Sequence, residues 1–156
     1  MNTASGWYST AMGKNTIAPS FAETTIGRFN TNYTPNAINS WDSADRLFVI
    51  GNGSNISRND AMVVMKSGDV GIGEAPTETS AILEVNSTSQ GVLLPSMTEA
   101  QRDAIATPAT GLLVFQTDNT PGFYYYDGSS WTAITGGGGS STGSDANTLI
   151  YTTNGF

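Results

Sequence analysis

A repeat of fourteen residues at the start of the chain constrains its fold more than any other feature. A shift of the sequence by fourteen positions aligns Ala4 with Ala18, Thr10 with Thr24, Met12 with Ile26, Gly13 with Gly27, and Lys14 with Arg28. A short fixed period with small residues at fixed phases is typical of stacked coils rather than of a globule. We therefore expect residues 1–30 to form about two coils of a β-roll, with two short strands in each copy. Gly13 and Gly27 would allow tight corners or close backbone approach, and Met12 and Ile26 would point into the coil.

The composition favours strands throughout the chain. Only 12% of the residues are charged, which is about half the usual share, and there are 18 glycines. Uncharged polar residues with many glycines suit strands and tight turns better than helices. Residues 31–45 are rich in turn formers and are predicted to be a connector.

Residues 46–76 contain strands that are too apolar for a thin segment to bury by itself. Leu47–Ile50 and Ala61–Met65 are unbroken apolar runs, and Val70 and Ile72 alternate with glycines. Unbroken runs are expected where both faces of a strand are covered. The cover could come from the rest of the same chain or from other copies of it. Three copies wound about one axis would supply it, and we expect a triangular β-prism-like shaft in an elongated, intertwined homotrimer.

Residues 77–135 are predicted to form a small β-meander module with one short helix near 97–106. Residues 81–86 and 91–95 read as short strands before the helix. Two pairs have the spacing of a capping box, namely Thr98 with Gln101 and Ser96 with Glu99. The meander strands are predicted at Leu112–Thr117, Phe123–Tyr126 and Ser130–Ile134. Residues 136–147 are expected to be a Gly/Ser linker, and 148–156 the start of a truncated downstream module.

The charge and the missing residue types exclude several functions. The net charge of −7 argues against binding to nucleic acid or to an anionic membrane surface. The longest apolar runs are far too short to span a membrane, so no membrane insertion is expected. Without Cys or His, the chain cannot form disulfides, thiolate metal sites or a Ser-His-Asp triad of its own. Met1 lies almost inside the first repeat and no signal peptide is visible, which favours a piece of a longer protein.

Carboxylates are the first candidate site residues. Pairs that could hydrolyse glycosides are Asp42 with Asp45, Asp60 with Asp69, and Glu74 with Glu78. Solvated loop carboxylates are far commoner than catalytic pairs, so no catalytic residue is predicted and the chain is not expected to be an enzyme. Asp60 and Asp69 could also bind calcium, but turn capping is favoured, so no metal site and no cofactor is predicted.

Aromatic side chains are the second candidate. Tyr124, Tyr126 and Trp131 could stack on sugar rings and are the predicted glycan contacts. Alternation along a strand places Tyr124 and Tyr126 on one face and Tyr125 on the other, and the exposed face would be the one available. Cross-strand packing or a contact between chains is the competing interpretation.

Three segments together resemble known fibre proteins. TASGWYSTAMGKNT resembles the head repeats of trimeric autotransporter adhesins, which form a left-handed parallel β-roll in a homotrimer. DRLFVIGNGSNISRNDAMVVMKSGDVGIG resembles shaft segments of bacteriophage tail fibres. GVLLPSMTEAQRDAIATPATGLLVFQTDNTPGFYYYDGSSWTAI is similar to a small module of tail-fibre and surface proteins in Bacteroidota and their phages.

The resemblance implies a structural and attachment role outside the cell and supplies no catalytic residues. It implies a homotrimeric fibre, in a virion tail or at a cell surface, that presents a distal part for binding a glycan or protein receptor. A fibre-borne polysaccharide depolymerase and a bacterial surface adhesin are the alternatives.

Overall fold

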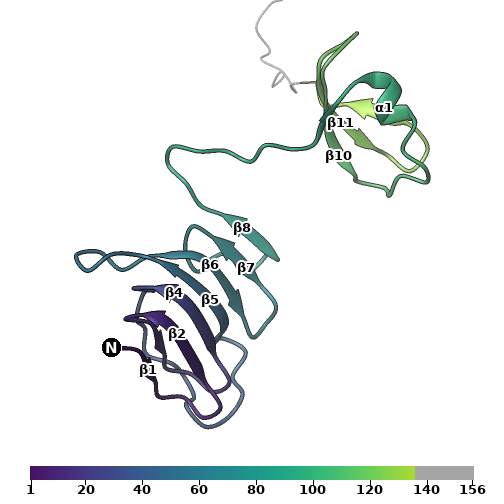
Figure 1. The fold of residues 1–156 in the computed structure, drawn as a ribbon. Coiled ribbons are helices and arrows are strands. Elements are labelled where there is room, and N and C mark those ends of the chain that lie inside the picture. The colour runs from purple at the N-terminus through teal and green to yellow at the C-terminus, as the bar shows by residue number, and fades with distance from the viewer. Residues whose placement is uncertain (136–156) are drawn as a thin grey trace, which may run out of the picture. The chain divides into compact units, whose positions relative to one another are not determined.

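The computed structural model describes residues 1–135, which form two compact units that divide after Val92 (Figure 1). Both units are built from β-strands, and the described residues contain one short helix, so the predicted all-β class is confirmed. No helix in residues 1–135 is long and apolar enough to cross a membrane. The predicted linker at 136–147 and the downstream module at 148–156 lie outside the described residues.

The first unit contains a six-stranded sheet in the order β2-β4-β5-β6-β7-β8 and a two-stranded sheet of β1 and β3 (Figure 1). Its strands are β1 (Thr3–Ala4), β2 (Thr10–Lys14), β3 (Ile17–Ala18), β4 (Thr24–Arg28), β5 (Arg46–Asn52), β6 (Asp60–Met65), β7 (Val70–Ile72) and β8 (Leu83–Val85). Strands β2, β4 and β5 run parallel, whereas β5, β6 and β7 form an antiparallel meander to which β8 adds in parallel.

The fourteen-residue repeat is the pairing register of the first two coils. Ala4 pairs with Ala18 between β1 and β3, and Thr10 pairs with Thr24 between β2 and β4. A third coil follows at a different spacing, because Thr24 pairs with Phe48 of β5, twenty-four residues later. The ten additional residues lie in the connector, so the strand register is kept while the corner lengthens.

Glycines allow these strands to approach closely. Gly13, Gly27 and Gly51 pair with one another across β2, β4 and β5. Gly27 has φ of +94°, and a Cβ there would lie 2.2 Å from the carbonyl oxygen of Gly51. The role of these glycines is therefore close backbone approach within strands, and not the formation of corners.

Met12 and Ile26 do not point into the coil, so that prediction is wrong. Met12 is 61% exposed. Thr25, Val49 and Val63, which pair with one another in the adjacent row across β4, β5 and β6, are fully buried. Along these strands the interior takes the Thr25, Val49 and Val63 side chains, and Met12 and Ile26 lie on the opposite side.

The structure also divides the chain differently from the predicted boundaries. Residues 1–30 and 46–76 share one sheet, because β5 pairs with the free edge of β4. The connector lies against the coils, with the amide of Phe21 donating to the carbonyl of Ala37. The predicted module of 77–135 includes the segment that forms β8, but β8 pairs with β7 and belongs to the first unit.

The second unit is a four-stranded sheet in the order β12-β11-β10-β9 with one helix. Its elements are β9 (Ser96–Met97), α1 (Glu99–Asp103), β10 (Leu113–Gln116), β11 (Gly122–Tyr126) and β12 (Trp131–Ala133). Strand β9 takes the place of the strand predicted at 91–95. Of the two predicted capping boxes, the structure forms Thr98 with Gln101, in both directions.

Candidate interaction surfaces

The six-stranded sheet carries two continuous rows of side chains on the side away from the coil interior. Because each strand pairs in register with the next, residues that share a row lie side by side across the whole sheet. One row consists of Met12, Ile26, Ile50, Met62, Ile72 and Val85. The other consists of Thr10, Thr24, Phe48, Val64, Val70 and Leu83. We call these twelve residues the outer face.

The outer face is apolar except at Thr10 and Thr24, and it is accessible to solvent. Met12 is 61% exposed, Leu83 56% and Val85 45%, and the residues at the centre of the sheet are half-buried. A sheet face that meets water normally carries polar side chains. This surface is therefore a candidate contact surface for another polypeptide.

The opposite side of the same sheet encloses a buried polar cluster. Arg46 and Asp60 form an ion pair at 3.3 Å, with both side chains nearly inaccessible. The Lys66 Nζ donates to the Ser20 Oγ at 3.0 Å and lies 4.0 Å from the Asp45 Oδ2. These groups tie the coils to the hairpin of β6 and β7.

Burial controls the protonation behaviour of this cluster. Desolvation raises the pKa of Glu23 above its usual value, although the Ser20 amide donates to its carboxylate at 3.0 Å. Desolvation lowers the pKa of Lys66, with the Asp45 carboxylate opposing that shift. Desolvation also raises the pKa of Tyr33 to about 12. The cluster is a set of mutually paired groups that stabilises the coil.

The structure gives three of the six candidate catalytic carboxylates a structural role. Asp45 accepts the backbone amides of Asn36 and Ala37 at 2.8 and 3.0 Å, which fixes the connector. Asp42 accepts the amide of Ala44 in the adjoining turn. Asp60 is held by Arg46 at the start of β6, whereas Asp69 lies beyond its other end.

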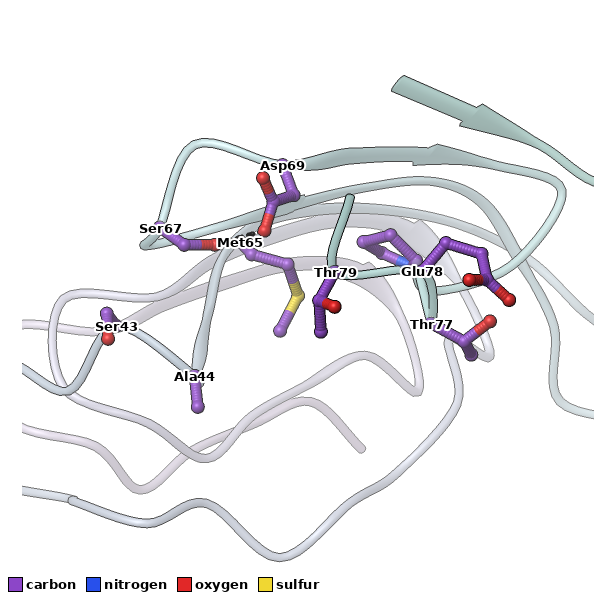
Figure 2. A pocket seen from close by; sticks show the side chains of 9 residues that line it. Ser43, Ala44, Met65, Ser67, Asp69, Thr77, Glu78 and Thr79 are labelled. Atoms are coloured by element: carbon purple, nitrogen blue, oxygen red, sulfur yellow. Dashed lines mark hydrogen bonds between the residues drawn. The ribbon is translucent and has the colours of Figure 1, made fainter. Parts of the chain in front are cut away.

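Glu78 and Asp69 lie around an open hollow of about 260 Å³ in the first unit (Figure 2). Met65 also lines this hollow, together with short polar side chains. The nine residues that line the hollow include no Lys or Arg side chain and no aromatic ring. Within residues 1–135 there is no group of three or more acidic side chains arranged to hold a metal ion.

Two of the three predicted glycan contacts pack around one arginine in the second unit. Tyr124 is 8% exposed and donates its hydroxyl to the carbonyl of Thr120 at 3.1 Å. The guanidinium of Arg102 lies 4.6 Å from the ring centre of Tyr124 and 5.8 Å from that of Trp131. Tyr124 is therefore not available to a sugar, because helix α1 places Arg102 over it.

Tyr126, the third predicted contact, packs edge to face on Trp131 with ring centres 5.5 Å apart. Both rings are half-buried. The prediction that Tyr124 and Tyr126 share one face is consistent with the register, but it is the face that the helix covers. Arg102, which organises this face, was not recognised in the sequence. Its only signal is the capping box, which places it in the last turn of a short helix.

The other side of this sheet is apolar and exposed. Phe123 is 46% exposed, Tyr125 37% and Leu113 37%, and Phe115 packs edge to face on Phe123 at 5.1 Å. Leu113 pairs with Tyr125, and Phe115 with Phe123, so the four side chains form one patch. We call this patch the aromatic face. Alternation along the strand predicted two faces, but the sequence did not show which one the helix covers.

Comparison with known families identifies the second half of the chain. Residues 71–154, more than half of the sequence, match a family described as the phage tail like trimerisation region. No curated protein and no solved structure shows a significant match. The family match confirms the coarser part of the resemblance, a phage tail fibre-like protein. The likeness of the repeats to adhesin heads and of 91–134 to a Bacteroidota module stays a prediction. Since the match covers more than half of it, the chain belongs to the family of phage tail like trimerisation regions.

Proposed function

We propose that the chain is a structural, non-catalytic part of a homotrimeric extracellular fibre of the phage tail type. The observation that carries this proposal is the aromatic face, which lies entirely inside the matched region. Helix α1 covers one side of the four-stranded sheet, and Leu113, Phe123 and Tyr125 remain exposed on the other.

Association of three chains accounts for this exposure. A sheet covered on one side by a helix would carry polar residues on its free side if it worked alone. Large aromatic side chains gain most when they are removed from water, and exposed clusters of them mark contact surfaces. The family description names trimerisation, so the partner with the strongest support is a second and a third copy of this chain.

The proposed place of the chain is a virion tail or a comparable fibre outside the cell, where it would present a distal receptor-binding part. Three linked copies would give such a fibre avidity for a repeated surface ligand, a glycan or a protein. The structural contacts made by Asp45 and Asp60 support the non-catalytic role over a depolymerase.

Light scattering coupled to size-exclusion chromatography tests the proposal. The expected mass is three times the 16.3 kDa of one chain. The Phe123→Asp variant should shift this mass towards that of the single chain, whereas Ala100→Asp, at an exposed position on helix α1 on the other side of the sheet, should leave it unchanged and is the control. A purified chain that stays a monomer at micromolar concentration contradicts the proposal.

A further inference from the structure

We infer that the outer face of the six-stranded sheet is a second interface between the three chains, in which three copies of this sheet cover one another. The inference rests on the proposed homotrimer and specifies where its chains meet. Most of the outer face lies before residue 71 and therefore outside the matched family region. It would extend the three-chain contact from the trimerisation region into the coils at the start of the chain.

The register supplies the first argument. The row from Met12 to Val85 is apolar at each of its positions on six successive strands. Chance placement of single apolar residues on a surface is ordinary, but a straight row across an entire sheet is not. The second row adds Phe48, Val64 and Val70 beside it, so the apolar area is two side chains wide at the centre of the sheet.

The distribution of polar groups supplies the second argument. The coil interior encloses Glu23, Lys66 and Asp45, all of them charged or able to carry charge. These groups flank β4, β5 and β6, whose inner side buries Val49 and Val63 but leaves Phe48, Ile50, Met62 and Val64 on the outer face. An isolated soluble chain would be expected to place polar side chains at these outer positions, whereas a chain whose sheet is covered by its own copies would show apolar ones.

The ends of the rows identify the partner as another copy. Ile72 on β7 and Leu83 and Val85 on β8 belong to the outer face, and all three lie within the matched region 71–154. The outer face is thus continuous with the part of the chain that the family match links to trimerisation. Its other margin is polar, because Lys14 and Arg28 pair next to the apolar row, as expected at the rim of an interface.

Cysteine accessibility tests the inference, since the chain contains no cysteine of its own. Three single variants have similar exposure in one chain: Met12→Cys at 61%, Leu83→Cys at 56% and Ile38→Cys at 51%. Met12 lies on the outer face outside the matched region, and Leu83 on the outer face inside it. Ile38 lies in the connector and is the control. The rate of reaction with a maleimide is measured for each variant under native conditions and again in denaturant.

We expect the thiols at positions 12 and 83 to react more slowly than the thiol at position 38, by about tenfold or more, in protein whose mass is that of a trimer. The three rates should become equal in denaturant. If the protein is a trimer but the thiol at position 12 reacts as fast as the one at position 38, the inference is wrong and the proposed function stands. A monomeric wild-type protein would overturn both.

Discussion

The close approach of three strands at paired glycines can be tested by adding one methyl group. Gly27 of β4 has φ of +94°, and Gly68, in the turn between β6 and β7, has φ of +103°. Alanine at either position meets the same left-handed backbone strain, which costs about 1–2 kcal/mol. The two sites differ in their surroundings. A Cβ at position 27 would lie 2.2 Å from the Gly51 carbonyl oxygen, whereas at position 68 nothing lies within 4 Å.

The clash at position 27 cannot be relieved by a side-chain movement, because the atom that it meets is backbone. Overpacking of this kind adds about 1–3 kcal/mol, so we expect Gly27→Ala to lose about 2–5 kcal/mol of unfolding free energy. Gly68→Ala should lose only the part due to strain. Urea unfolding followed by circular dichroism, at one protein concentration for all variants, gives both values. Equal losses in the two variants would refute the argument that Gly27 is required for close strand approach.

Three further predictions concern other parts of the fold. Arg102→Ala should destabilise the second unit by about 2–4 kcal/mol, because it leaves the buried amide oxygen of Gln116 without its donor. Near-ultraviolet circular dichroism in urea measures this, and loss of the aromatic signal at the same urea concentration in variant and wild type would contradict it. Burial raises the pKa of the Glu23 carboxyl above 4.5 in the folded chain. Above pH 4.5 the folded chain therefore binds more protons than the unfolded chain, and Glu23 makes the unfolding free energy fall as the pH rises. Glu23→Gln should remove that fall in urea titrations from about pH 4 to 8, and an identical pH profile in both proteins would count against it. Thr98→Ala should cost about 1 kcal/mol, since its hydroxyl accepts the amide of Gln101 at the start of α1; a thermal melt that does not move would show that the cap is dispensable.

The repeat was the part of the fold that the sequence predicted best, because the length of the repeat equals the number of residues between paired positions on neighbouring strands. The pairing of Thr10 with Thr24 and of Gly13 with Gly27 follows directly from the offset of fourteen. The third coil was missed because its offset is larger. Its signal is the dipeptide Ile50-Gly51, which repeats Ile26-Gly27 and would be found by a search that allows the spacing to vary.

The direction of the side chains was harder to predict than the strands themselves. Alternation shows that Met12 and Ala11 lie on opposite sides of β2, but not which side is the interior. That choice depends on which side of the sheet the coils enclose, which is a tertiary property. The same limit applies to Tyr124, since only the position of Arg102 on the packed helix decides which face of β11 is covered.

The longer third turn shows that strand register and corner length are set independently in this architecture. Between Thr31 and Arg46 the chain accommodates ten more residues than the first two turns, yet Ile50 still lies beside Ile26. Asn39 and Ser40, which are exposed within this excursion, are therefore a natural place to graft a foreign peptide. A cargo carried there would be displayed once per chain while the strands that stack beneath it kept their alignment.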